Sequence, residues 1–143
     1  MPFYRVSTSV FASAESVWAV LLDKMDHPQR YIEDALGVDI LERGPEAMVR
    51  QLVLPGGVTF RERVVPHPSA RTVTFTLLDH PLYEGQVVNH LQKDAEGRTE
   101  LVFELDWTLR PGCVEERDPQ ELLDLIRSSV SHTKRIAEAL ESG

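Results

Sequence analysis

The sequence predicts an α+β fold in which an antiparallel sheet of about seven strands packs against one long C-terminal helix. Two observations predict this. Strand-length segments joined by short turns run from residue 36 to residue 109, a pattern typical of sequential antiparallel pairing. A single long helical pattern, residues 118–141, follows them, and a sheet with one apolar face needs such a cover.

The N-terminal part predicts a strand followed by two short helices. Residues 3–11 alternate as a strand does, and Ser13 is placed to cap the helix that follows. Residues 26–28, Asp-His-Pro, break this helix, and residues 29–34 are expected to form a second, short helix. The apolar stripe of the first helix consists of Val17, Trp18, Leu21, Leu22 and Met25.

The remaining strands are expected to follow one another with short turns. Their predicted ranges are 36–40, 48–54, 58–65, 72–78, 82–92 and 99–109. Side-chain alternation assigns one face of these strands to the interior and the other to solvent. A chain of 143 residues with this order is expected to form one domain, residues 1–143.

The apolar stripe of the long C-terminal helix has small hydroxyl residues at its centre. Its start is marked by Asp118 as N-cap, Pro119 at the first helical position and Glu121 within reach of the cap. At 100° per residue, the centre of the stripe falls on Ser129 and Thr133, where a helix over a solid core carries Leu or Ile. The two small residues indicate either a tight helix–sheet crossing or a space beneath the helix, where a small molecule would bind.

Composition excludes several classes of function. The formal charge of −8 argues against partners that require basic residues, namely nucleic acid and anionic membrane surfaces. No stretch approaches the roughly 18 apolar residues of a membrane span, and no apolar signal segment follows the N-terminus. The one cysteine, Cys113, cannot form an internal disulfide, so we expect a reducing compartment and interpret the protein as cytoplasmic.

Cofactor motifs are absent from the sequence. The five histidines show no H-x-H or H-E-x-x-H spacing, and neither glycine-rich nucleotide-binding motif occurs. We therefore expect no metal site and no cofactor.

Alternation places three polar side chains, Glu62, Tyr83 and Asn89, on the otherwise apolar inner face. A carboxylate there is costly unless it is paired, hydrogen-bonded or protonated, which suits a catalytic acid or base and makes Glu62 the candidate catalytic residue. The alternative is that Glu62 bonds a buried arginine or a backbone group, or that it reaches the rim of the sheet. Asn89 and Tyr83 are equally open to a purely structural role in the core.

The predicted ligand-binding residues surround these positions on the sheet and on the helix that faces it. They are Phe60, Phe75, Tyr83, Asn89, Phe103, Trp107, Ser129 and Thr133. The aromatic members form either an apolar wall against a ligand or a simple packed core.

The element order resembles the START-like or SRPBCC helix-grip superfamily, the fold of the birch pollen allergen, and within it the AtaL-like branch. The residues that carry the resemblance are the strand 3–11 with residues 14–18 behind it, and the segments 61–64, 85–89 and 103–107. The resemblance implies a deep cavity between a curved sheet and the long helix. Members of the superfamily bind lipids, hormones or polyketides, and some cyclise or dehydrate aromatic polyketides. No catalytic signature runs across the superfamily, so no residue role is transferred.

Three hypotheses follow. The first is a protein that binds a hydrophobic small molecule, lipid or polyketide-like, with Glu62, Tyr83 and Asn89 orienting its polar end. The second is a cyclase, dehydratase or isomerase of a polyketide-like substrate with Glu62 as acid or base. The third is a protein-interaction module with a packed core. It would use either the edge strand or the outer sheet face, namely Arg61, Arg63, Thr72, Thr74 and Thr76.

Overall fold

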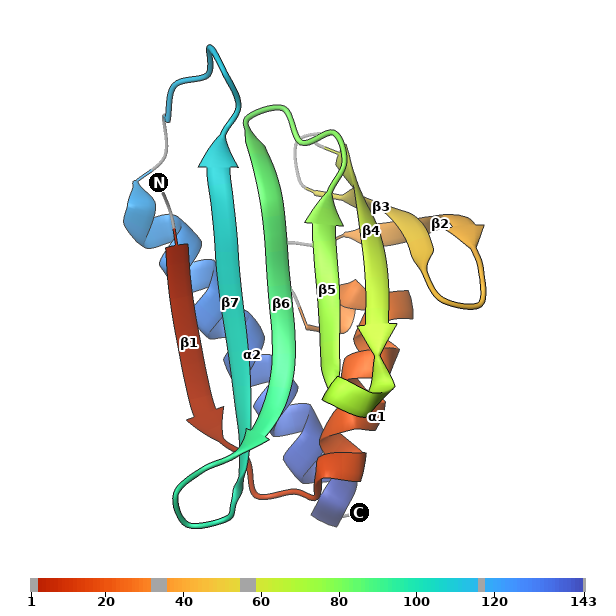
Figure 1. The fold of residues 1–143 in the computed structure, drawn as a ribbon, viewed down its shortest axis with the longest axis vertical. Coiled ribbons are helices and arrows are strands. Elements are labelled where there is room, and N and C mark those ends of the chain that lie inside the picture. The colour runs from red at the N-terminus through yellow and green to blue at the C-terminus, as the bar shows by residue number, and fades with distance from the viewer. Residues whose placement is uncertain (1–2, 32–35, 55–58, 116–117, 143) are drawn as a thin grey trace.

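The computed structural model describes residues 3–31, 36–54, 59–115 and 118–142. Its strands form one seven-stranded sheet in the order β1-β7-β6-β5-β4-β3-β2, and neighbouring strands are antiparallel throughout. Both α-helices lie on the same side of this sheet (Figure 1). The predicted α+β architecture is therefore confirmed. The strands are β1 (Phe3–Ser9), β2 (Gly37–Arg43), β3 (Met48–Val53), β4 (Thr59–His67), β5 (Thr72–Leu77), β6 (Tyr83–Lys93) and β7 (Thr99–Leu109).

The two α-helices begin at the predicted caps. In α1 (Ala14–Asp26), the Ser13 hydroxyl accepts a hydrogen bond from the backbone N–H of Ser16 at 3.1 Å. In α2 (Pro119–Ser142), the Asp118 carboxylate accepts one from the N–H of Gln120 at 3.0 Å. These bonds satisfy N–H groups that a helix start leaves without an internal partner. The described residues also form two short 3₁₀ helices, η1 (Pro28–Arg30) and η3 (Pro68–Ala70).

The structure corrects two predicted boundaries near the N-terminus. β1 ends at Ser9 rather than at residue 11. The chain leaves the sheet there, because the N–H of Phe11 donates to the Glu138 carboxylate of α2, at 2.9 Å, instead of to a neighbouring strand. The expected second helix, 29–34, is only the 3₁₀ turn η1 in the described residues, and 32–34 lie outside them. Tyr31 ends this turn, with its hydroxyl held on Asp23 at 2.7 Å.

The buried face of α1 also differs from the predicted stripe. Leu22 is 37% exposed, whereas Lys24, which an apolar pattern omits, is 4% exposed. The spacing explains the difference, because Lys24 lies three residues after Leu21 and seven after Val17, both fully buried on the same helix face. The helix thus directs a lysine toward the sheet.

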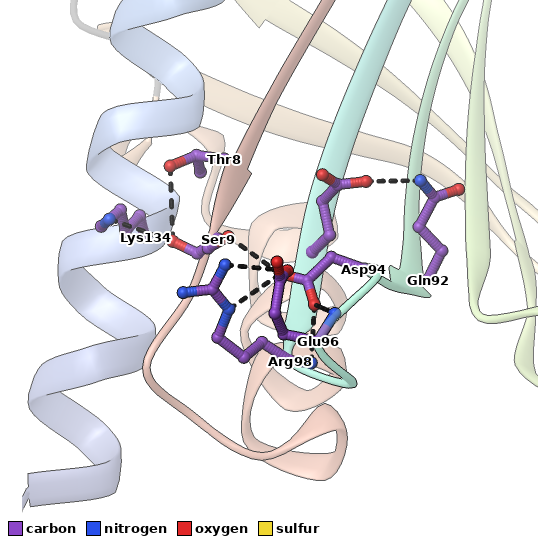
Figure 2. Close-up of polar contacts among 8 residues, drawn as sticks. Thr8, Ser9, Gln92, Asp94, Glu96, Arg98 and Lys134 are labelled. Carbon is purple, nitrogen blue, oxygen red and sulfur yellow. Dashed lines mark hydrogen bonds and ion pairs between the residues drawn. The ribbon is translucent and has the colours of Figure 1, made fainter.

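Polar contacts at the β6–β7 turn tie the end of the sheet to α2 (Figure 2). The Asp94 carboxylate accepts the N–H groups of Glu96 and Arg98, each at 2.9 Å, which closes the turn. Its second oxygen accepts the Ser9 hydroxyl at 3.3 Å. The Lys134 ammonium donates to the Ser9 carbonyl at 3.0 Å, so β1, the turn and α2 meet at one place.

One glycine, Gly85, lies where β6 leaves no room for a side chain beside the backbone of β7. Gly85 has φ of +130°, and a Cβ atom built on it would lie 2.1 Å from the carbonyl oxygen of Asp106. Only glycine fits that contact, because both the backbone conformation and the space exclude a side chain.

We predict that Gly85→Ala lowers the free energy of unfolding by about 2–5 kcal/mol, from backbone strain together with steric overlap. The matched control is Gly97→Ala, where φ is also positive, +78°, but no atom lies within 4 Å of the added Cβ. The control is expected to lose only about 1 kcal/mol, from strain alone. Urea unfolding of both variants measures the difference, and equal losses would show that the Asp106 contact has no effect.

Candidate functional site

The inner face of the sheet encloses a cavity of about 320 Å³ beneath α2. Small-molecule sites in proteins commonly have volumes of roughly 300–1,000 Å³. Side chains from α1, β3 to β7, the β5–β6 loop and α2 line the space. Most of the sequence-predicted site residues are among them, namely Phe60, Glu62, Phe75, Phe103, Trp107 and Ser129. The same face also carries the packed hydrophobic core, which includes Phe60, Phe75 and Phe103.

Lys24 is the central polar group of the cavity wall. Its Nζ donates to the Asn89 side-chain oxygen at 3.0 Å and to the Ser129 hydroxyl at 3.2 Å. It also lies 4.1 Å from the centre of the Phe103 ring and 5.4 Å from that of Phe75. The amine thus extends from α1 across the cavity wall to both the sheet and α2.

The surroundings of Lys24 disfavour its charged form. Burial, followed by repulsion from the Arg50 guanidinium, lowers the pKa of Lys24 from 10.5 to about 7, and attraction to Glu62 only partly opposes the shift. Its direct hydrogen-bond partners, Asn89 and Ser129, are neutral. A substantial fraction of the folded protein therefore carries an uncharged amine at neutral pH.

Glu62 is held by a buried arginine. The Arg50 Nε and Nη2 groups both donate to Oε1 of Glu62, at 3.1 and 2.9 Å, and the two residues face each other across β3 and β4. Arg50 Nη1 donates to the backbone carbonyls of Lys24 and Met25, at 2.9 and 2.8 Å. This geometry matches the structural alternative considered for Glu62. Because both guanidinium bonds end on Oε1, Arg50 leaves Oε2 unengaged at the cavity wall.

An aromatic cluster forms another part of the site. The His80 ring lies 5.0 Å from Phe60, 5.3 Å from Tyr83 and 5.6 Å from Trp107, measured between ring centres. His80 Nδ1 accepts the backbone N–H groups of Leu82 and Tyr83, at 3.1 and 3.2 Å. A neutral His80 ring therefore carries its proton on Nε2.

Three sequence-predicted residues are buried near the cavity without lining it. Tyr83 packs in the aromatic cluster, and its hydroxyl has no hydrogen-bond partner among the described residues. Asn89 lies behind Lys24 and reaches the site through that amine. Thr133 donates to the Ser129 carbonyl at 2.8 Å, within α2 itself. These three positions are thus structural neighbours of the cavity rather than parts of its wall.

Comparison with known proteins identifies the family. Residues 1–131 match the family model described as polyketide cyclase/dehydrase and lipid transport. The chain belongs to this family. A search of curated proteins gives no match.

Solved structures share the fold of this chain at low sequence identity. The Zhui aromatase/cyclase from a Streptomyces species is 20% identical, with 99% of this chain and 93% of that chain covered and a TM-score of 0.74. A Thermus thermophilus protein is 14% identical, with coverage of 97% and 99% and a TM-score of 0.75. XoxI from Bacillus cereus is 20% identical, with coverage of 99% and 96% and a TM-score of 0.67.

These matches confirm the predicted SRPBCC superfamily and helix-grip fold, while the AtaL-like branch stays a prediction. Among the helices described for this family member, none is both long and apolar enough to cross a membrane.

Sequence reasoning missed two site residues of this family member, Lys24 and Arg50. A signal existed for Arg50, because β3 alternates Met48, Arg50 and Leu52 on its buried face, opposite Glu62 on the next strand. For Lys24 the only signal was its helical spacing from Val17 and Leu21. Charged residues are usually placed outside a helix stripe, so pattern reading assigns such a lysine to solvent.

The lowered pKa of Lys24 predicts a specific dependence of stability on pH. Between about pH 7 and pH 10.5 the unfolded chain holds a proton on this lysine that the folded chain has lost. The cost of burying the ammonium is therefore fully present below pH 7 and is relieved as pH rises through that window. Its contribution to the free energy of unfolding increases by at most about 1.4 kcal/mol per pH unit.

The measurement compares urea unfolding of the wild type and Lys24→Met at steps across this window. Methionine keeps the length of the side chain without the titrating group, so the difference between the two proteins isolates Lys24 from other titrations. We expect the wild type to gain stability relative to the variant as pH rises. A constant difference would show that Lys24 titrates normally in the folded protein.

Proposed function

We propose that the protein binds a hydrophobic small molecule, lipid-like or polyketide-like, in the cavity between the sheet and α2. The observation that carries this proposal is a space of about 320 Å³ with a mostly apolar wall and a few buried polar groups. Sites for small molecules combine such a wall with few polar groups that orient the ligand. The lipid transport and polyketide chemistry in the family description agrees with this class of ligand.

The contacts within the wall support one orientation for the proposed ligand. Lys24 and Arg50 both pack over the Phe75 ring, and Glu62 is bound to Arg50, so the charged groups are gathered together. Lys24 Nζ lies over the ring of Phe103 in β7. Trp107 is four residues further along the same strand, a distance of roughly 13 Å for an extended chain. An elongated ligand would place an oxygen atom at Lys24 and its apolar body toward Trp107.

The test is thermal unfolding against fatty acids, sterols, flavonoids and aromatic polyketide-like acids. A ligand at 100 times its dissociation constant stabilises the native state by about 2.7 kcal/mol, which raises the melting temperature by roughly 5–20 °C for a domain of this size range. We predict that Ser129→Leu, which fills part of the cavity, abolishes the shift.

Ser131→Leu is the matched control, because Ser131 is exposed on the same helix and outside the cavity wall. It should fold and bind as the wild type does. A shift that survives Ser129→Leu would place the ligand elsewhere, and no shift with any compound class would count against the cavity proposal.

We propose, as a second candidate, cyclase, dehydratase or isomerase chemistry on a polyketide-like substrate with Glu62 as acid or base. The supporting observation is that Glu62 and Lys24, two groups able to transfer protons, line one cavity, with Oε2 of Glu62 not engaged by Arg50. A structural neighbour of the same fold is named an aromatase/cyclase.

For this candidate we predict that Glu62→Gln lowers turnover of a cavity-bound substrate by about 10²-fold or more, because glutamine cannot transfer the proton. Ligand binding should survive, as measured by the thermal shift. Glu84→Gln serves as control, because Glu84 is exposed on the outer face of β6. Normal turnover in Glu62→Gln would remove Glu62 from the chemistry and leave the binding proposal intact.

A further inference from the structure

We propose that Lys24 is a nucleophile and that the cavity takes a hydrophobic aldehyde or ketone, which Lys24 binds as a reversible imine. This inference rests on the proposed function, because the carbonyl compound must enter the same cavity. It names a ligand class and a covalent attachment point.

The first support is where the amine lies. Nζ is surrounded by residues of the cavity wall, with the Phe103 ring centre at 4.1 Å, the Phe75 ring centre at 5.4 Å and the Ser129 hydroxyl at 3.2 Å. A carbonyl group on an apolar ligand that fills this space therefore meets the nitrogen directly.

The second support is the number of acceptors. A neutral amine has two N–H donors and one lone pair, whereas an ammonium has three N–H donors and no lone pair. The described hydrogen bonds of Nζ go to two acceptors, Asn89 Oδ1 and Ser129 Oγ. Those two bonds satisfy the neutral amine and leave its lone pair available for attack on a carbon atom.

The third support is the charge around the amine. The carboxylate of Glu62 is bound by the Arg50 guanidinium rather than by Lys24, and the groups in contact with Nζ from β6 and α2 are an amide and a hydroxyl. Burial and Arg50 lower the pKa of Lys24 to about 7, so the nucleophilic form is well populated at neutral pH.

The reaction balances without any added oxidant, reductant or cofactor. The nitrogen lone pair attacks the carbonyl carbon, a C–N bond forms, and one N–H proton moves to the oxygen to give a carbinolamine. The C–O bond then breaks, the second N–H proton leaves with the oxygen as water, and a C=N bond remains. The sum is amine plus carbonyl compound giving imine plus one water, and hydrolysis reverses it.

The experiment uses 2-naphthaldehyde as the probe, with sodium cyanoborohydride to reduce the imine to a stable amine. Intact mass spectrometry counts the attached groups, and peptide mapping assigns them among Lys24, Lys93 and Lys134, which are all the lysines of the sequence. We expect Lys24 to be labelled at least tenfold faster than the other two at pH 7. 2-Methylnaphthalene, which lacks the carbonyl, is the competitor and should protect Lys24 alone.

Lys93 and Lys134 are controls within the same molecule, so the result does not depend on a variant that folds. Labelling of Lys24 no faster than that of the other lysines would overturn the inference. If 2-methylnaphthalene still shifts the thermal unfolding in that case, the binding function stands and only the imine fails. If neither compound acts at the cavity, both proposals fail.

A second variant tests the electrostatic part of the argument. Asn89→Asp places a carboxylate against Nζ, which raises the pKa of Lys24 and removes the lone pair. We expect labelling of Lys24 at pH 7 to fall roughly tenfold or more and to recover as pH rises. Asn89→Gln, which stays neutral, should not shift that pH profile, and an unchanged profile in Asn89→Asp would contradict the role assigned to the neutral amine.

Discussion

The charged groups of the cavity wall, Lys24, Arg50 and Glu62, are connected by the hydrogen bonds of one buried arginine. Arg50 is 1% exposed and uses its guanidinium in two directions. Toward β4 it binds Glu62, and toward α1 it binds the backbone carbonyls of Lys24 and Met25. Those carbonyls lie in the last turn of the helix, where a cation is favourable to the helix dipole. The arginine therefore holds the last turn of α1, which carries Lys24, against the sheet.

The buried group formed by Lys24, Arg50 and Glu62 is not the arrangement that would make the fold most stable. A buried ion pair often contributes less than a well-packed apolar pair of the same volume, because two charges lose their hydration. Leu or Met at positions 24, 50 and 62 would fill the space with less cost. The group holds two basic residues, Lys24 and Arg50, and one carboxylate, that of Glu62, which is bound to Arg50. The described hydrogen bonds of Lys24 therefore reach no anion, and loss of its proton leaves the group of three electrically neutral.

Local pattern predicts much of the fold and part of the site, because alternation along β4 to β7 and the spacing in α2 both reflect burial of one face. It placed Glu62 on the inner face and Ser129 at the cavity, as observed. Thr133 bonds the helix backbone instead, through a local bond to the residue four positions earlier that any helical threonine can make. Pairing of charges across elements could not be predicted. The Arg50–Glu62 contact requires the register of β3 against β4, and the Lys24 contacts require the angle at which α1 crosses the sheet. Lysine, arginine and glutamate are mostly found at the protein surface, so each of these residues, taken alone, would be assigned to an exposed position.

The charge balance of that group also links ligand chemistry to protonation. An anionic ligand would favour the protonated form of Lys24. Because the pKa of Lys24 lies at about 7 in the empty cavity, the protein would take up a proton when such a ligand binds near neutral pH. A carbonyl ligand would instead select the neutral amine and give the opposite dependence on pH. The same residue therefore discriminates between two classes of ligand by the sign of the proton change. The Arg50–Glu62 pair makes this possible, since Arg50 binds the Glu62 carboxylate and opposes its attraction for the charged form of Lys24.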